Sequence, residues 1–198
     1  MSILPIYLFG TEVLKKTAKS VASLDDSTVK LIYDMFETMH EANGLGLAAT
    51  QVGDLRRVIT IDISDVTEPN AEGETEDTMH PTSPDLPKTL ALINPEILSE
   101  DGTWIMEEGC LSLPKLHDEV ERADKIRIRY YDADFKKQEL SADGLLARVI
   151  LHELDHLNGV LFVDRVSRTK RSMLLPKLRK IRKGEIEVDY PVVTAEEE

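Results

Sequence analysis

The sequence predicts an α+β fold: a single domain, residues 1–198, in which mixed, mostly antiparallel strands pack around one central helix, with a further helix near the C-terminus. Two observations lead to this prediction. Short β-rich runs are spread unevenly among a few helical segments, unlike the regular alternation that builds a parallel sheet. In addition, a chain of 198 residues that is 41% hydrophobic suits one compact core better than two.

The first helix is predicted over residues 25–43. Its apolar residues recur at steps of three and four, as on one buried helical face: Val29, Ile32, Met35, Phe36 and Met39. Residues 25–27 offer side-chain oxygens that can cap the first amides, and the pair 43–44 can adopt the left-handed conformation that ends a helix. A Gly-rich stretch over residues 44–49 follows, and the β-branched run at residues 57–63 predicts a strand.

Residues 65–88 are predicted to form a long exposed acidic loop. Before Lys88 this segment contains many Asp and Glu residues but no Lys or Arg, and four prolines interrupt it. Strand-like runs resume at residues 89–93, 103–106 and 125–131. In the last of these runs apolar and basic side chains alternate, which predicts a half-buried strand.

Two helices are predicted in the last third of the chain. The first covers residues 141–158 and has Gly159 at its end; its apolar side chains at helical spacing are Leu145, Leu146, Val149, Ile150, Leu154 and Leu157. The second covers residues 167–183, where Pro176 is expected to kink the helix or to start a new turn. An acidic tail over residues 184–198 ends the chain.

Charge and cysteine content narrow the class of protein. With 24 Lys and Arg against 37 Asp and Glu, the net charge is −13, so unspecific binding to DNA or to an anionic membrane is not expected. Cys110 is the only cysteine, which excludes an internal disulfide and suits a reducing compartment. No stretch approaches the roughly 20 apolar residues of a membrane span, and the apolar start has no features of a secretory leader. We expect a cytoplasmic protein.

The helix at residues 141–158 contains the pattern His-Glu-x-x-His. His152 and His156 are four residues apart and therefore share one helical face, so both imidazoles can bind one cation. Glu153 can hold a water molecule at that cation. This spacing indicates a hydrolytic metal site, and the alternative is two ordinary histidines, one in the core and one at the surface.

A third protein ligand is needed, because a catalytic site normally combines three protein ligands with one open position. A longer form of the motif has His where this chain has Phe162, which cannot bind a metal. Glu185 or Glu187 is a possible ligand, but both lie in the polar tail. Cys110 is a further candidate, although a lone cysteine is more often a buried apolar residue. The acidic residues 107–108 before Cys110 favour its assignment as a ligand, since a core cysteine seldom has such neighbours.

Three segments, in this order, resemble the peptide deformylase family. They are Gly-Leu-Gly-Leu-Ala-Ala-Thr-Gln at residues 44–51, Glu-Gly-Cys-Leu-Ser at 108–112 and His-Glu-Leu-Asp-His at 152–156. The likeness extends from about residue 6 to residue 165. It implies removal of the N-formyl group from the formyl-methionine of nascent polypeptides in bacteria or organelles, which yields formate and a free amino terminus. It also implies one Fe(II) per chain, for which Zn, Ni or Co can substitute.

The resemblance also implies roles for individual residues. The implied metal ligands are Cys110, His152 and His156. The implied catalytic groups are Glu153 as the acid and base, and Gln51 and the Leu111 amide as donors to the oxyanion. The implied substrate contacts are Leu45, Gly46, Met106, Gly109, Leu145 and Val149, of which Leu145 is equally suited to core packing. Arg122 is implied to pair with Glu108, and an exposed, weak pair is the alternative.

The basic segment at residues 167–183 contains no acidic residue, in contrast to the rest of the chain. Since the implied substrate emerges from a ribosome, this segment is a candidate for docking on ribosomal RNA, and a merely solvated basic helix is the alternative. Two other functions stay open from sequence. They are a zinc endopeptidase that uses the same two histidines and a noncatalytic binding module with a decayed site.

Overall fold

A computed structural model describes residues 2–67 and 82–198 of the chain. Its strands are β1 (Ile6–Tyr7), β2 (Gly46–Ala48), β3 (Val58–Asp62), β4 (Thr89–Asp101), β5 (Trp104–Cys110), β6 (Leu113–Arg122), β7 (Lys125–Tyr131), β8 (Lys137–Asp143) and β9 (Val192–Val193). Its α-helices are α1 (Asp26–Glu41), α2 (Ser64–Thr67), α3 (Gly144–Leu157) and α4 (Arg168–Arg182), and its short 3-10 helices are η1 (Val13–Lys15), η2 (Ala49–Val52) and η3 (Phe162–Asp164). The predicted α+β class is confirmed.

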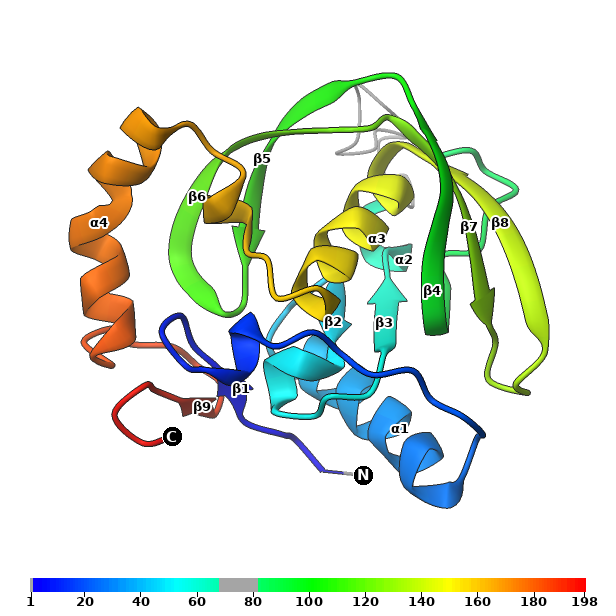
Figure 1. The fold of residues 1–198 in the computed structure, drawn as a ribbon, viewed down its shortest axis with the longest axis horizontal. Helices are drawn as coiled ribbons and strands as arrows, with labels where there is room; N and C mark the ends of the chain where they lie inside the picture. The colour runs from blue at the N-terminus through cyan, green and yellow to red at the C-terminus, as the bar shows by residue number, and fades with distance from the viewer. Residues whose placement is uncertain (1, 68–81) are drawn as a thin grey trace.

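The strands of the described residues form three sheets. The largest has the order β2-β3-β4-β7-β8, and all its neighbouring strands are antiparallel. Strands β5 and β6 form a separate antiparallel hairpin, and β1 pairs with β9 in parallel. Helix α3 lies at the centre of the molecule, between the hairpin and strands β7 and β8 (Figure 1).

Packing, rather than helix propensity, holds α3 in place. All of its residues are buried, and its apolar face joins a core cluster with the inner faces of β3, β7 and β8. Full burial of one aliphatic side chain contributes about 1.5–3 kcal/mol, so several such residues can support polar side chains elsewhere on the same helix. Gly159 has a φ of +73° and follows the end of α3 as predicted; a Cβ there would lie 2.5 Å from the carbonyl oxygen of Lys15.

The predicted first helix is confirmed as α1. Asp25 is its N-cap, and the Asp25 carboxylate accepts a hydrogen bond of 2.7 Å from the backbone N–H of Thr28. Asn43 has a φ of +53° and follows the end of the helix in the predicted left-handed conformation. The strand predicted at residues 57–63 is β3.

The structure corrects several boundaries and adds strands that were not predicted, among them β6 and β8. The strands predicted at residues 89–93 and 103–106 continue to Asp101 and Cys110 as β4 and β5. The helix predicted over residues 141–158 begins only at Gly144, because residues 141–143 pair with β7 as the end of β8. The acidic loop predicted over residues 65–88 begins within the short helix α2. Residues 68–81 of that prediction lie outside the described residues.

Helix α4 confirms the predicted C-terminal helix. Ser167 caps its first turn, and the helix continues through Pro176 without a break. Leu178 and Ile181 are buried in a cluster with residues of β6, whereas most of the basic side chains are exposed. Within the described residues, no helix is both long and apolar enough to cross a membrane.

Candidate metal centre

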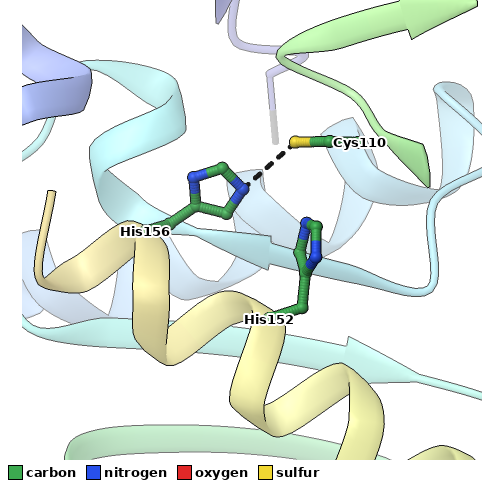
Figure 2. A group of neighbouring side chains, drawn as sticks. All are labelled: Cys110, His152 and His156. Carbon is green, nitrogen blue, oxygen red and sulfur yellow. Dashed lines mark hydrogen bonds between the residues drawn. The ribbon is translucent and has the colours of Figure 1, made fainter. Parts of the chain in front are cut away.

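Three potential metal ligands come together at the centre of the molecule. Cys110 is the last residue of β5, and His152 and His156 lie on consecutive turns of α3 (Figure 2). One donor atom from each residue lies within 4.8 Å of the others. The Cys110 Sγ is 3.1 Å from the Nε2 of His156. In the part of the chain that the structure describes, this is the one such group of His, Cys, Asp or Glu, and it includes neither Glu185 nor Glu187.

Glu108 fixes the ring of His152. Its carboxylate lies 2.9 Å from the Nδ1 of His152, so that nitrogen carries a hydrogen and the Nε2 is the ring atom available to bind a metal. Burial lowers the pKa of His156 well below its usual value, which keeps that ring in the neutral form that binds a metal.

Buried charges connect the β5–β6 hairpin to α3. Arg122 makes two hydrogen bonds to Glu108, of 2.5 and 2.9 Å, and a third of 2.7 Å to Asp155 on α3. Arg148, also on α3, donates to Glu108 at 2.8 Å and to the carbonyl of Val120 at 3.0 Å. Arg122 is only 5% exposed, so the alternative of an exposed, weak pair is wrong. Burial acts to raise the pKa of Glu108, but hydrogen bonds with His152 and Arg122 hold that pKa well below its usual range.

The donor set fits a divalent transition metal. One thiol and two imidazoles are the ligands that zinc and iron accept, and three protein ligands leave one position for water or substrate. One carboxylate oxygen beside these donors has no hydrogen-bond partner: the Oε2 of Glu153 is buried and makes no hydrogen bond to another described residue. Burial raises the pKa of Glu153 to about 7, which suits a group that accepts and returns a proton near neutral pH.

Gln51 presents its amide nitrogen to the loop that follows β5. Its Oε1 accepts a hydrogen bond of 2.8 Å from the backbone N–H of Ala48, which fixes the side chain from behind. Its Nε2 then lies 3.3 Å from the Oγ of Ser112 and 3.7 Å from the Sγ of Cys110. A side-chain donor therefore faces Cys110, one of the three potential metal ligands.

Comparisons with known proteins identify the family. The family model described as "Polypeptide deformylase" matches residues 3–172. The chain belongs to the polypeptide deformylase family. It is 44% identical to a peptide deformylase of Salinibacter ruber, over 99% of this chain and 97% of the relative, and 42% identical to one of Brucella suis, over 91% and 94%.

Solved structures of deformylases agree with this assignment. The crystal structure of a peptide deformylase from Legionella pneumophila matches with a TM-score of 0.77 and 40% identity, over 93% of this chain and 98% of that one. A deformylase from Ehrlichia chaffeensis, solved in complex with actinonin, matches with a TM-score of 0.77 and 33% identity, over 94% and 100%. The family is metal-dependent, and its members remove the formyl group from nascent peptides.

In this deformylase family member, a cleft opens beside the three potential ligands. All the residues predicted to contact substrate line it: Leu45, Gly46, Met106, Gly109, Leu145 and Val149. Gln51, Leu111 and Glu153 line the same cleft. A Cβ at Gly46 would lie 2.6 Å from a carboxylate oxygen of Glu153 and 2.8 Å from Val149, so only glycine lets strand β2 pass this close to α3.

Two features of the site were not predicted. Arg148 was not singled out, although a charged residue four positions before His152 on an otherwise apolar face was a signal for a buried ion pair. The tail residues 188–190 also line the cleft, which no local pattern indicated, and Glu187, considered above only as a possible metal ligand, lines it with them.

We expect Glu108→Gln to lower both stability and metal affinity. The substitution leaves two buried guanidinium groups with less negative charge, and breaking such pairs typically costs about 3 kcal/mol. It also weakens the hold on His152, which typically reduces metal affinity 10- to 100-fold. Denaturant titration of the metal-free chain and competition with a chelator measure the two effects. Glu121→Gln, at an exposed position of β6, is the matched control, and equal losses in both variants would contradict the prediction.

Proposed function

We propose that this chain hydrolyses the N-formyl group of formyl-methionyl nascent peptides, as a metallo-amidase with Cys110, His152 and His156 as metal ligands. The observation that carries this proposal is the grouping of the three donors, of which Cys110 and His152 line a cleft together with the buried carboxylate of Glu153. Family membership supports the same substrate. When bound, the ion would supply Lewis-acid activation of the formyl carbonyl and of water.

Glu153 would move the proton that this hydrolysis requires. Water adds its oxygen to the formyl carbon, and the proton that it loses goes to the carboxylate of Glu153. The bond between the formyl carbon and nitrogen then breaks, and Glu153 returns the proton to the leaving amine. Formate and a free amino terminus are the products, and the carboxylate is regenerated.

Gln51 and Leu111 would meet the negative charge that develops on the formyl oxygen. The Nε2 of Gln51 is already directed at Cys110 and at Ser112, in the loop that follows β5, and the N–H of Leu111 belongs to that loop. Donors that are held in place before the reaction need no reorganisation during it, and the loss of one such donor typically lowers the rate by about 10²- to 10³-fold.

The remaining cleft residues would select the substrate. Met106, Leu145 and Val149 offer an apolar wall for the methionine side chain, and Leu45, Gly46 and Gly109 are in place to contact the peptide backbone. A formyl group carries only hydrogen beyond its carbonyl. A narrow recess beside the metal ligands would therefore admit a formyl group and exclude larger acyl groups.

We propose Fe(II) as the natural ion, with Zn, Ni or Co able to replace it, because thiolate and imidazole accept all four. The test is release of formate from formyl-Met-Ala-Ser under anaerobic conditions, together with metal analysis of the purified chain. Acetyl-Met-Ala-Ser is the matched substrate control. Release of formate with no cleavage of the acetylated peptide supports the proposal. Cleavage of internal peptide bonds without formate release would favour a zinc endopeptidase, and no turnover at all would favour a noncatalytic module.

We also propose that α4 docks on ribosomal RNA, which would place the chain in the bacterial cytoplasm. Lys177, Arg179 and Lys180 are exposed on α4, and neutralised phosphates release counterions that favour binding. Changing these three residues to Glu is expected to weaken cosedimentation with ribosomes by about 10-fold or more and to reduce its salt dependence.

A charge-matched control separates docking on α4 from overall charge. The control carries the same change at three exposed lysines elsewhere: Lys16, Lys125 and Lys137. If α4 is only a solvated helix, both triple variants will cosediment to the same extent, and the docking proposal fails.

A further inference from the structure

The C-terminal tail returns to the active-site cleft. After α4 the chain turns back towards the N-terminus, and β9 lies beside β1 (Figure 1). On the way, residues 187–190 line the same cleft as Cys110 and Glu153. A segment far from the sequence motifs therefore forms one wall of the site.

The tail is fixed immediately after Tyr190. The backbone N–H of Ile6 donates to the carbonyl of Pro191 at 2.9 Å, and the N–H of Leu8 donates to that of Val193, also at 2.9 Å. The ladder between β1 and β9 therefore begins at the residue after Tyr190. This anchoring gives the Tyr190 ring a defined position at the cleft.

Tyr190 holds the loop that follows β5. Its hydroxyl donates a hydrogen bond of 2.8 Å to the backbone carbonyl of Leu111, and its ring and the Leu111 side chain pack against the same core cluster. The hydroxyl of an ordinary tyrosine keeps its proton at neutral pH, so it is a permanent donor.

Other contacts hold the neighbouring groups of this loop. The backbone N–H of Phe9, two residues after β1, donates to the carbonyl of Ser112 at 2.9 Å. The side chain of Ser112 accepts from Gln51, and Cys110 pairs with Leu113 across the hairpin. The hydrogen bond from Tyr190 holds the Leu111 carbonyl, so each of the residues 110–112 has a contact that fixes it.

We propose that Tyr190 is a positioning residue for the oxyanion donor at Leu111. The N–H and the carbonyl of Leu111 flank a single Cα, so a bond that fixes the carbonyl also restricts the direction of the N–H. The tail would thus hold in place, before substrate binds, a donor that acts only as charge develops on the formyl oxygen. This inference rests on the proposed deformylase function.

The test is Tyr190→Phe, which removes one hydroxyl and leaves the ring to pack. With formyl-Met-Ala-Ser, we expect kcat to fall about 10-fold with KM unchanged, because a loosened donor retains part of its effect. In the zinc-loaded protein, the NMR order parameter of the Leu111 amide is expected to fall from the rigid value of about 0.85. Metal content is expected to stay the same. Tyr33→Phe makes the same chemical change on the exposed face of α1 and is expected to alter none of these quantities.

The outcomes separate this inference from the proposed function. If Tyr190→Phe matches wild type in kcat and in the order parameter, the positioning role is overturned, while formate release by wild type still supports the function. A rise in KM with kcat unchanged would also overturn it, since the tail would then act only as a binding wall. If wild type released no formate, the proposed function would fail. An unchanged order parameter at Leu111 would then overturn the positioning of this loop independently.

Discussion

Replacing Cys110 with alanine is expected to abolish metal binding and, with it, formate release. The three donor atoms lie within 4.8 Å of one another, and two imidazoles on one helix are a weak site without the thiolate. The side chain is small and only partly buried, so the substitution leaves little empty space in the core. Metal analysis after anaerobic purification, with formate release measured on the same sample, checks this expectation.

Glu107→Ala is the matched control for Cys110→Ala. Glu107 lies on the same strand, lines the same cleft and is exposed, but it is not among the three donors. We expect it to retain metal. A Cys110→Ala protein that still bound one ion per chain would contradict the assignment of Cys110 as a ligand. That result would favour the alternative function, a zinc endopeptidase with a different third ligand.

The helices could be predicted from sequence because their signals are local. In α1 the apolar spacing and the capping side chain of Asp25 lie within one short segment, and the same holds for α4 and its cap at Ser167. Strand β8 was missed because its residues gain their partners only from β7. That pairing also explains the error at the start of α3, since residues 141–143 are extended where helical spacing alone predicted a helix.

The residues of the site likewise differ in whether local sequence signals could predict their positions. The relative position of His152 and His156 on α3 could be predicted from sequence, because residues four apart on a helix share a face. The approach of Cys110 to that face depends on the β5–β6 hairpin. The contacts of Arg122 and Arg148 that join this hairpin to α3 span 28 to 44 residues. The acidic neighbours of Cys110 and the family resemblance, not spacing, linked Cys110 to the histidines. The contribution of Tyr190 follows from the pairing of β1 with β9, which no local pattern records.

Replacing Glu153 with alanine is expected to preserve metal binding but to lower kcat for formyl-Met-Ala-Ser by about 10²- to 10⁴-fold, the range typical of a lost general acid or base. Glu153 is not among the three donors, so the ion should remain. Its carboxylate is buried, and burial raises its pKa to about 7, so the group is poised to exchange protons at neutral pH. Metal content and formate release, measured together, distinguish this result from the simple loss of the ion that is expected for Cys110→Ala.

Glu187→Ala supplies the control that the interpretation of Glu153 requires. Glu187 is also a carboxylate that lines the cleft, but it is exposed and stands on the tail instead of on α3. If negative charge in the cleft were all that mattered, both variants would lose activity to a similar degree. A proton-transfer role demands a different result, in which Glu187→Ala retains most of its turnover. Because Gln has nearly the same shape as Glu and strand β2 passes close to this side chain at Gly46, the conservative Glu153→Gln should keep its place, hold its metal and still fail to turn over. Substantial formate release by Glu153→Gln would show that another group moves the proton.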